Sequence, residues 1–419
     1  MMYNLPYLAG KKVVYVGSSR EKSNLETFLS ELGGSTNFEA ISGKSQKETI
    51  DKLKTFDPAT TVFIKAHGIP GYMMPYPYTT VARIFFDCVK QLGVKSVGVI
   101  GTKGKTTTSS LLAHILKDAG LDARLCSELG SPLLESLKNT TSETVLIVEL
   151  SSYQLAELKQ SPDVAVIVNL YKDRVTYHGT MELYLEAQHN AIRYMDENCA
   201  VIYSPEEEVV LQWLKESKAR QMPIDPQENV DMSRSQLFGE HNAQNYLMAK
   251  KAASLFGVDN LNCMSSLATF EPVRHRLQIV RTVRGITFVD DAIGSTPEAT
   301  MAGIKAIIKN KGPVGCVMLG GVDRRYDFTE LVELLYRVNI PSLVFFPDTG
   351  PIIETLLPEN YTPEKFNATD MDEAVQWAFD HTPSGSICLL STASPSTVLW
   401  HSFEEKGSLF QQAVLALPN

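Results

Sequence analysis

Short apolar runs alternate with longer amphipathic stretches along most of the chain, which is the pattern of an α/β protein. The apolar runs are rich in valine and isoleucine, as expected of parallel strands that are buried on both faces. The intervening stretches repeat apolar side chains every three or four residues, which indicates helices that pack on one face. The predicted strands are residues 12–17, 61–65, 97–100, 144–150, 164–169, 286–291, 315–321, 342–347 and 386–391.

Breaks in this pattern divide the chain into three predicted domains. A chain of 419 residues is too long for one hydrophobic core. The segment 71–78 is rich in proline and tyrosine and predicts a loop over a cleft, and a helix pattern ends near Gly93. The predicted domains are residues 1–92, 93–270 and 271–419. We expect a mostly parallel, doubly wound sheet in each, with Rossmann-like folds at both ends of the chain.

Composition and charge narrow the class of protein. Hydrophobic residues make up 44% and charged residues 21% of the chain, as in ordinary soluble globular proteins. The net charge of −9 disfavours a general nucleic-acid binder. The six cysteines are scattered without a C-x-x-C pair, which indicates reduced thiols in a cytoplasmic protein. No apolar run approaches the roughly 18 residues of a membrane span, so we expect no integral membrane contact.

The stretch VGVIGTKGKTTT at residues 97–108 joins a predicted strand to a helix pattern through a glycine turn. Backbone N–H groups and the helix dipole at such a helix N-terminus favour a bound phosphate. Lys105 would reach the β- and γ-phosphates of a nucleotide, and the Thr106 hydroxyl would hold Mg²⁺. The alternative is a plain turn without a ligand. The predicted phosphate-site residues are Gly101, Thr102, Lys103, Gly104, Lys105, Thr106 and Thr107.

A second candidate group follows the strand at residues 144–150, where Glu149 precedes Ser151. An acidic residue at the end of a strand parallel to the phosphate-loop strand is where a Mg²⁺ ligand belongs. Thr106 and Glu149 are therefore the predicted metal ligands, and an ordinary strand-end carboxylate is the alternative. The first turn, residues 17–23, lacks the further glycines of a dinucleotide fingerprint, which disfavours a nicotinamide cofactor.

Six motifs, taken in order, resemble the Mur ligase superfamily over nearly the whole chain. They are GTKGKTTT at 101–108, ELSSYQL at 149–155, GEHNAQN at 239–245, HR at 275–276, GGVD at 320–323 and FEEKG at 403–407. Each motif alone would be weak, but their order is specific. The chain length resembles that of the smaller branch of the family, which adds D-glutamate.

The resemblance implies a monomeric, three-domain, ATP-dependent amide ligase of peptidoglycan precursor synthesis. The first domain would hold a UDP-linked muramoyl substrate, the second ATP with Mg²⁺, and the third the incoming amino acid, with D-glutamate as the default. ATP would phosphorylate the substrate carboxylate, and the amine of the amino acid would attack the acyl phosphate. Phosphoryl transfer between two anions needs charge neutralisation, which Lys105 and a bound Mg²⁺ would supply.

The resemblance also assigns roles to individual residues. It implies that the catalytic residues include Lys105, Glu149 and His178, and we add Arg174 as a hypothesis because it departs from the family pattern. It implies that the nucleotide is bordered by His241, Asn242, Asn245, Arg276 and Asp290, in addition to the phosphate loop. It implies that the substrates are bordered by Ser151, Ser295, Arg324, Ser396 and Phe403. For His241 alone, the alternative is a capping or core histidine.

Two departures from the family pattern fall on one metal site. The family reads roughly D-H-x-D-R-H-G where residues 173–179 read DRVTYHG, so Arg174 replaces a metal-binding histidine. The family's Y-x-x-A-K lysine is carbamylated and binds a second Mg²⁺, and its position here is Gln188. Glutamine carries no charge, and a guanidinium has no acceptor for a metal. We expect Arg174 to act instead as a guanidinium clamp on phosphate.

The predicted amino-acid pocket departs from the D-glutamate branch as well. Where that branch reads D-S-K-A-T-N, residues 291–296 read DAIGST. Ile293 therefore replaces the lysine of that branch in this chain. The family also has a lysine after its Gly-Gly-x-Asp motif. Arg324 stands at that position in this chain, and it could still hold a carboxylate side chain. Two alternatives to a D-glutamate ligase therefore stay open. One is a divergent ligase for another carboxylate and amino acid, and the other is a catalytically weakened ATP-binding homologue.

Overall fold

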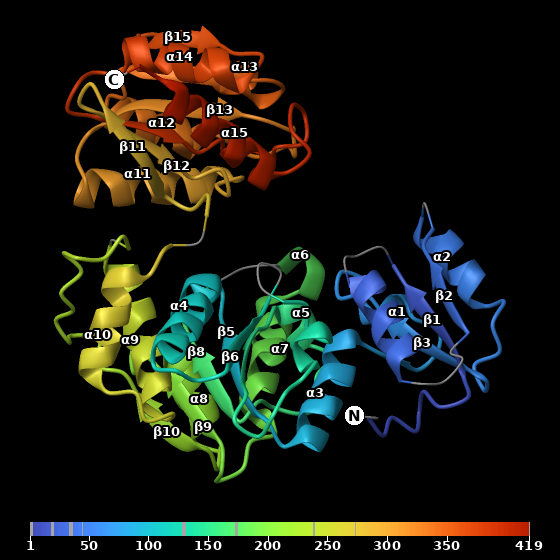
Figure 1. Cartoon of the computed structure of the whole chain (residues 1–419). Coiled ribbons are helices and arrows are strands. Elements are labelled where there is room, and N and C mark those ends of the chain that lie inside the picture. Colours follow the sequence, from blue (N-terminus) through green and yellow to red (C-terminus); the bar gives the residue numbers. More distant parts are fainter. Residues whose placement is uncertain are drawn as a thin grey trace. The chain divides into compact units, whose positions relative to one another are not determined.

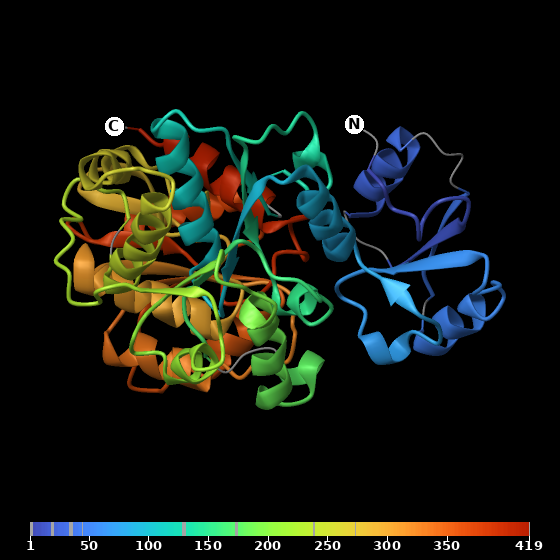
Figure 2. The ribbon, with the colours of Figure 1, turned by 90° about the horizontal axis from the view of Figure 1, so that it is seen from below.

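Two compact units make up the chain in this computed structural model. The first comprises Met1–Gln236 and Glu240–Phe270, and the second comprises Leu237–Gly239 and Glu271–Asn419. The structure describes residues 3–17, 21–32, 37–43, 45–127, 131–171, 175–237, 239–272 and 274–418. Figure 1 labels most of the helices and strands of both units, and Figure 2 shows the same ribbon from below. Within the described ranges, no helix combines the length and the apolar character needed to cross a membrane.

The first sheet of the first unit has four parallel strands in the order β2-β1-β3-β4. Their bounds are Phe38–Ile41 (β2), Lys12–Val16 (β1), Thr61–Lys65 (β3) and Tyr78–Thr79 (β4). The helices of this part are α1 (Glu21–Glu31), α2 (Gln46–Leu53) and the short 3-10 helix Gly71–Met73. The strands predicted at 12–17 and 61–65 are confirmed. The predicted loop at 71–78 holds the 3-10 turn and the start of β4.

The second sheet has six parallel strands in the order β10-β9-β8-β5-β7-β6. Their bounds are Arg220–Pro223 (β10), Ala200–Tyr203 (β9), Val164–Ile167 (β8), Lys95–Ile100 (β5), Val145–Glu149 (β7) and Ala123–Cys126 (β6). The helices are α3 (Val81–Leu92), α4 (Lys105–Asp118), α5 (Ser152–Leu155), α6 (Val175–His178), α7 (Met181–Arg193), α8 (Glu208–Leu214), α9 (Glu240–Ser254) and α10 (Asn260–Thr269), with a 3-10 turn at Glu135–Leu137.

One hydrophobic cluster runs through both of these sheets. It contains Tyr15 of β1, Phe85 of α3, Leu146 of β7 and Val201 of β9, each of which is fully buried. Helix α3 ends at Leu92 and is capped by Gly93, which takes the left-handed conformation with φ of 65°. This helix end confirms the prediction that a helix ends near Gly93. The predicted domain boundary at 92/93 stays a proposal, because the buried cluster crosses it.

The second unit holds a six-stranded sheet in the order β11-β12-β16-β13-β14-β15. Its strands are Gln278–Val283 (β11), Ile286–Asp290 (β12), Ile387–Leu390 (β16), Val314–Gly320 (β13), Ser342–Phe346 (β14) and Glu364–Asn367 (β15). Only β11 is antiparallel, at one edge. Its helices are α11 (Pro297–Asn310), α12 (Thr329–Arg337), α13 (Thr349–Thr355), α14 (Met371–His381) and α15 (Phe403–Ala416).

Helices cover both faces of this sheet (Figure 1). Buried side chains of α11 and α12 share one hydrophobic cluster with the sheet, and those of α14 and α15 share another. The α/β class with mostly parallel sheets is therefore confirmed. In a parallel sheet the strand ends that precede the helices form a common edge, and ligands bind along that edge.

Candidate functional site

The predicted phosphate loop is the turn between β5 and α4. Residues Gly101 and Gly104 have φ values of 129° and 81°, which favour glycine. A Cβ on Gly101 would lie 2.6 Å from the Asn169 carbonyl oxygen, and one on Gly104 would lie 2.5 Å from Asn245 Oδ1. Both glycines are therefore required by conformation and by space, and α4 begins directly after them at Lys105.

Asn169 fixes the shape of this loop from the end of the neighbouring strand β8. Its carbonyl oxygen accepts a hydrogen bond from Thr102 N at 2.9 Å. Its side-chain amide accepts from Lys103 N at 2.9 Å and donates to the Lys103 carbonyl at 3.0 Å. The loop is thus held in one conformation before any ligand binds, which lowers the entropy cost of binding.

Lys105 and Thr106 open helix α4 in the places that the sequence predicts. The Lys105 ammonium donates to the Gly101 and Thr102 carbonyls at 2.8 and 3.2 Å, so it lies within the turn. The Thr106 hydroxyl donates to Glu149 Oε1 at 2.8 Å. Strands β5 and β7 are parallel neighbours, which is why the end of β7 brings this carboxylate to the start of α4. A hydroxyl and a carboxylate oxygen side by side fit the oxygen ligands that Mg²⁺ prefers.

Helix α9 supplies the predicted asparagines to the same loop. Asn245 is buried, and its side-chain oxygen lies next to Gly104. Its amide donates to Asn242 Oδ1 at 3.0 Å, which fixes the orientation of both side chains. His241 is exposed, so it is not a core histidine. The structure therefore brings Asn242 and Asn245 to the phosphate loop, while their contact with a nucleotide stays a prediction.

His178 and Ser151 lie beyond the strand ends of the same sheet. His178 Nε2 is 3.0 Å from the Ser152 hydroxyl. Ser151 is the N-cap of α5, where its hydroxyl accepts from Gln154 N at 3.3 Å in a capping box. The predicted roles of His178 in catalysis and of Ser151 in substrate binding remain predictions. Arg174 lies outside the described residues.

A buried acid and histidine join the predicted HR motif to β12 in the second unit. His275 Nδ1 lies 2.7 Å from Asp290 Oδ2, and Gln411 donates to the same oxygen at 2.8 Å. Asp290 is fully buried and its other oxygen accepts from Ala292 N at 2.9 Å. A Cβ on Gly407 would lie 2.0 Å from His275 Nδ1, which explains the glycine of the FEEKG motif. The Asp290 carboxylate is thus bonded within the fold, and its ribose contact stays a prediction.

The other predicted nucleotide and substrate residues of this unit differ in exposure. Arg276 and Ser295 are half-buried, and Arg324 is exposed. Ser396 is buried, and its hydroxyl has no hydrogen-bond partner within the described part of the chain. Phe403 begins α15, with its ring 6.4 Å from that of His275. The unpaired Ser396 hydroxyl is consistent with a binding role, because buried hydroxyls are normally bonded.

Comparison with known proteins gives one family. Residues 99–232 match the family model described as the Mur ligase middle domain. The UDP-N-acetylmuramoylalanine--D-glutamate ligase of Streptococcus suis is 30% identical over 338 residues, which cover 76% of this chain and 74% of that protein. The chain belongs to the Mur ligase family. The ligase of the same name from Clostridioides difficile is 27% identical and covers 97% of this chain and 99% of its own.

Solved Mur ligases share the fold over nearly the full length. The MurF ligase of Thermotoga maritima in complex with ADP has a TM-score of 0.62 at 17% identity, covering 97% of this chain and 99% of that chain. The UDP-N-acetylmuramate-alanine ligase MurC of the same organism has a TM-score of 0.60 at 16% identity, with coverage of 97% and 99%. At this level of identity, the comparison supports the Mur ligase fold and no more.

The second metal site of the family does not fit this Mur ligase. Gln188 is 1% exposed, and its amide nitrogen donates to the Tyr184 hydroxyl at 3.0 Å. It offers no negative charge to a second Mg²⁺. Within the described residues, three or more His, Cys, Asp or Glu side chains do not gather in any place that could hold a metal ion. The first site, at Thr106 and Glu149, would therefore depend on ligand phosphates for further oxygens.

Two buried charged residues near the Mur ligase motifs were missed by sequence reasoning. Burial raises the pKa of Asp291 to about 7, and its carboxylate accepts from the Ser391 hydroxyl at 2.7 Å. Burial lowers the pKa of Lys406 to about 7, and its ammonium donates to the Thr392 hydroxyl. Lys406 stands inside the FEEKG motif, which is the one signal that could have pointed to it.

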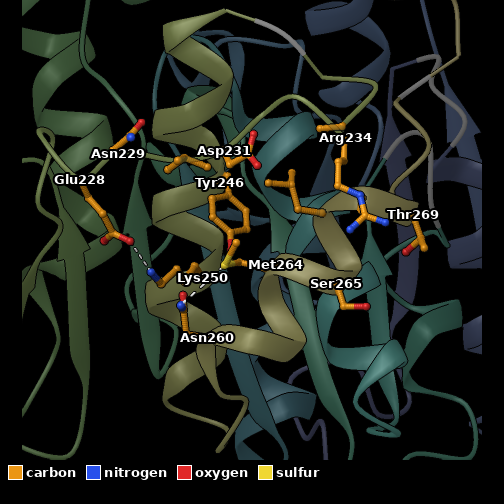
Figure 3. A pocket seen from close by; sticks show the side chains of 14 residues that line it. Glu228, Asn229, Asp231, Arg234, Tyr246, Lys250, Asn260, Met264, Ser265 and Thr269 are labelled. Atoms are coloured by element: carbon orange, nitrogen blue, oxygen red, sulfur yellow. Dashed lines mark hydrogen bonds and ion pairs between the residues drawn. The ribbon is translucent and has the colours of Figure 1, made fainter.

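A cavity of about 480 Å³ lies elsewhere on the first unit, beside α9 and α10 (Figure 3). Its side chains are mainly polar, and they include Tyr246, an ion pair between Lys250 and Glu228, and Arg234. The described residues that line it include no predicted site residue. Cavity volume therefore does not point to the predicted phosphate loop of this Mur ligase.

Proposed function

We propose that this chain is an ATP-dependent, ADP-forming amide ligase of peptidoglycan precursor synthesis. It adds D-glutamate to UDP-N-acetylmuramoyl-L-alanine. The observation that carries the proposal is the 2.8 Å bond between Thr106 and Glu149, at the start of a helix whose glycine turn also holds Lys105. Relatives named as D-glutamate ligases, which match most of the chain, support the choice of substrates.

The residues of the loop account for the first half of the reaction. The N–H groups at the start of α4 would bind the ATP phosphates, and Lys105 would offset their charge. Thr106 and Glu149 would hold Mg²⁺, which supplies Lewis-acid polarisation of the phosphate oxygens. The substrate carboxylate then attacks the γ-phosphorus, ADP leaves, and an acyl phosphate forms. Arg174 and His178 are proposed to stabilise the charge on the transferred group.

The second half of the reaction uses the incoming amino acid. Its amine attacks the acyl carbon, the amide bond forms, and inorganic phosphate leaves. We place the UDP-linked substrate on domain 1–92, ATP on domain 93–270 and the amino acid on domain 271–419. Ser295, Arg324, Ser396 and Phe403 are proposed to border the amino acid, and Ser151 the muramoyl substrate. We place the reaction in the cytoplasm and expect a monomer.

A second candidate function is a Mur-type ligase for another amino acid. Ile293 stands where the D-glutamate branch carries a lysine, and Arg324 is exposed. A pocket with one basic side chain fewer would hold an acidic amino acid less tightly. A third candidate, a weakened ATP-binding homologue, is favoured by Arg174 and Gln188 at the second metal site.

Phosphate release from ATP distinguishes the three candidates. The purified chain is incubated with ATP, Mg²⁺, UDP-N-acetylmuramoyl-L-alanine and one amino acid at a time. Release with D-glutamate and not with L-glutamate supports the proposal, and release only with another amine supports the second candidate. A protein that binds ATP and releases phosphate with no pair supports the third.

A further inference from the structure

The turn at residues 66–71 lies at the edge of the first sheet where a ligand is expected. The chain adds β2 on one side of β1 and then returns to add β3 on the other side. Ligands of parallel sheets bind beyond the carboxyl ends of the two strands that flank such a reversal. Both strand ends meet there, because Ala66 N donates to the Val16 carbonyl at 2.9 Å and a Cβ on Gly17 would lie 2.8 Å from Ala66 Cβ. The turn therefore lines the expected ligand-binding edge of this sheet.

A buried lysine holds this turn. Lys65, the last residue of β3, is fully buried, and its ammonium donates to the Ile69 carbonyl at 2.6 Å. The same nitrogen is 3.3 Å from Glu157 Oε1, and Tyr78 donates to the other oxygen of that carboxylate at 2.9 Å. A Cβ on Gly71 would lie 3.2 Å from Glu157 Oε1, so the turn passes close to the ion pair. Lys65 thus ties the turn to a carboxylate that follows α5, in the part of the chain that forms the second sheet.

A tyrosine of helix α6 holds the same turn. The Tyr177 hydroxyl donates to the His67 carbonyl at 3.1 Å and to the Ile69 carbonyl at 3.3 Å, so the two carbonyls share its single proton. Lys65 and Tyr177 therefore both donate to the Ile69 carbonyl, which has two lone pairs. Tyr177 directly precedes His178, for which a catalytic role is proposed. The turn beside the first sheet is thus fixed to the helix that carries His178.

Stability alone does not account for the ion pair between Lys65 and Glu157. Taking an ammonium and a carboxylate out of water costs about as much as their attraction returns, and uncharged side chains of similar size are often as stable. A pair kept only for stability could therefore be apolar. The bond from Lys65 to the Ile69 carbonyl gives the charged pair a second role, which is to fix the turn.

From this geometry we propose that Lys65 is a positioning residue for the UDP-linked substrate, and that Glu157 acts through Lys65. The two side chains hold the turn at residues 66–71 in the form that binds this substrate. The inference rests on the proposed function, which places the UDP-linked substrate on domain 1–92. It also gives the domain that is proposed to bind ATP a part in binding the other substrate, because Glu157 belongs to that domain.

The double substitution Lys65→Met with Glu157→Gln separates this role from a structural one. It removes both charges together, so no buried charge is left without its partner. Methionine cannot donate to Ile69, whereas the glutamine oxygen can still accept from Tyr78. We expect the affinity for UDP-N-acetylmuramoyl-L-alanine to fall about 10-fold or more, as for the loss of a hydrogen bond from a charged group. The affinity for a non-hydrolysable ATP analogue and the midpoint of denaturation should stay close to wild type.

Calorimetric titration of the full chain with each ligand in turn measures these affinities. The control is Lys12→Met with Glu39→Gln, which removes an exposed ion pair of 2.7 Å from the same sheet. Lys12 begins β1 and so lies at the opposite end of that strand from the turn. Weaker binding of the UDP-linked compound alone, in the Lys65 variant alone, supports the proposal. Equal affinity in this variant and wild type overturns it, and so does an equal loss for both ligands.

Hydrogen–deuterium exchange of the ligand-free chain tests the tie itself. The Ile69 amide donates to the Ala66 carbonyl at 3.1 Å, so its exchange rate measures how firmly the turn is held. Peptides that cover residues 66–74 should exchange faster in the double variant, while peptides of β1 and β7 should not change. Tyr177→Phe should have the same effect, and it gives an independent route if the double variant does not fold.

Tyr246→Phe is the matched control for Tyr177→Phe, since it removes a buried hydroxyl that has no partner among the described residues. Unchanged exchange of residues 66–74 in both test variants would overturn the positioning role, whatever the chain ligates. A wild-type chain whose turn is held in this way, but which does not bind UDP-N-acetylmuramoyl-L-alanine, would overturn the proposed function alone.

Discussion

The Thr106 hydroxyl donates to a carboxylate oxygen of Glu149 at 2.8 Å, although the two residues are 43 positions apart. The contact exists because β5 and β7 are parallel neighbours whose ends meet at one edge of the sheet. It joins the second residue of α4 to the last residue of β7. Substitution at either end is therefore expected to affect one and the same metal site.

Removal of the Thr106 hydroxyl should remove most of the activity. Thr106→Val keeps the shape of the side chain but takes away a metal ligand, and we expect kcat to fall by about 100-fold or more. Thr106→Ser retains the hydroxyl and serves as the matched variant, with kcat close to wild type. Initial rates of phosphate release over a Mg²⁺ titration provide the measurement. Equal losses in both variants would contradict a metal-binding role for the hydroxyl.

Removal of the Lys105 ammonium should weaken ATP binding. The ammonium sits within the phosphate turn and donates to two carbonyls there. We expect Lys105→Ala to lower the affinity for ATP by about 10-fold or more, since a charge-assisted contact contributes roughly 1.5–3 kcal/mol. Lys117→Ala, on the exposed last turn of the same helix, is the control. If ATP binds equally well to both variants, the phosphate-loop assignment is wrong.

The buried Lys406 should make stability depend on pH above neutrality. Its pKa is lowered from 10.5 to about 7, so the unfolded chain binds more protons than the folded chain between these values. Stability therefore rises with pH in this window, by up to about 1.4 kcal/mol per pH unit. The free energy of unfolding of wild type minus that of Lys406→Met should increase from pH 7 to pH 9. A flat difference would mean that Lys406 titrates normally.

Glu157 should be needed to tolerate the buried ammonium of Lys65. Lys65 is fully buried, with its nitrogen 3.3 Å from Glu157 Oε1, and Tyr78 donates to Glu157 Oε2 at 2.9 Å. Burial lowers the pKa of Lys65, and Glu157 opposes that shift. We expect Glu157→Ala to destabilise the fold by about 2–4 kcal/mol, because it leaves a buried charge without its partner.

A denaturant titration of the full chain measures this effect. Glu26→Ala removes an exposed carboxylate from α1 and should change stability by no more than about 0.5 kcal/mol. Similar midpoints for the two variants would show that Lys65 is neutral in the folded chain.

The parts of the fold that could be predicted from the sequence are those with a strong local signal. Strands such as β1, β8 and β13 are continuous apolar runs. The glycine turn before Lys105 can be recognised from its residue composition. Strands β10 and β15 were missed because they lie at sheet edges, where most of their side chains are exposed and break the apolar pattern.

The same distinction holds for the site. Lys105, Thr106 and Glu149 follow from strand-end positions in one sheet. The burial of Asp291 and Lys406 depends on helices and strands far apart in the sequence. A single sequence carries no local signal for such contacts, so the shifted pKa values of Asp291 and Lys406 became visible only in the folded chain.

The hydrophobic cluster that links β1 to β9 determines how many cooperative units unfold separately. Three sheets suggest three melting events, yet two of these sheets share one buried core. Removing residues 1–92, which include α3, would strip apolar cover from β7, so neither half should persist alone. Scanning calorimetry of the apo protein should therefore resolve two cooperative transitions, one of them carrying the proposed binding sites for both UDP-linked substrate and ATP.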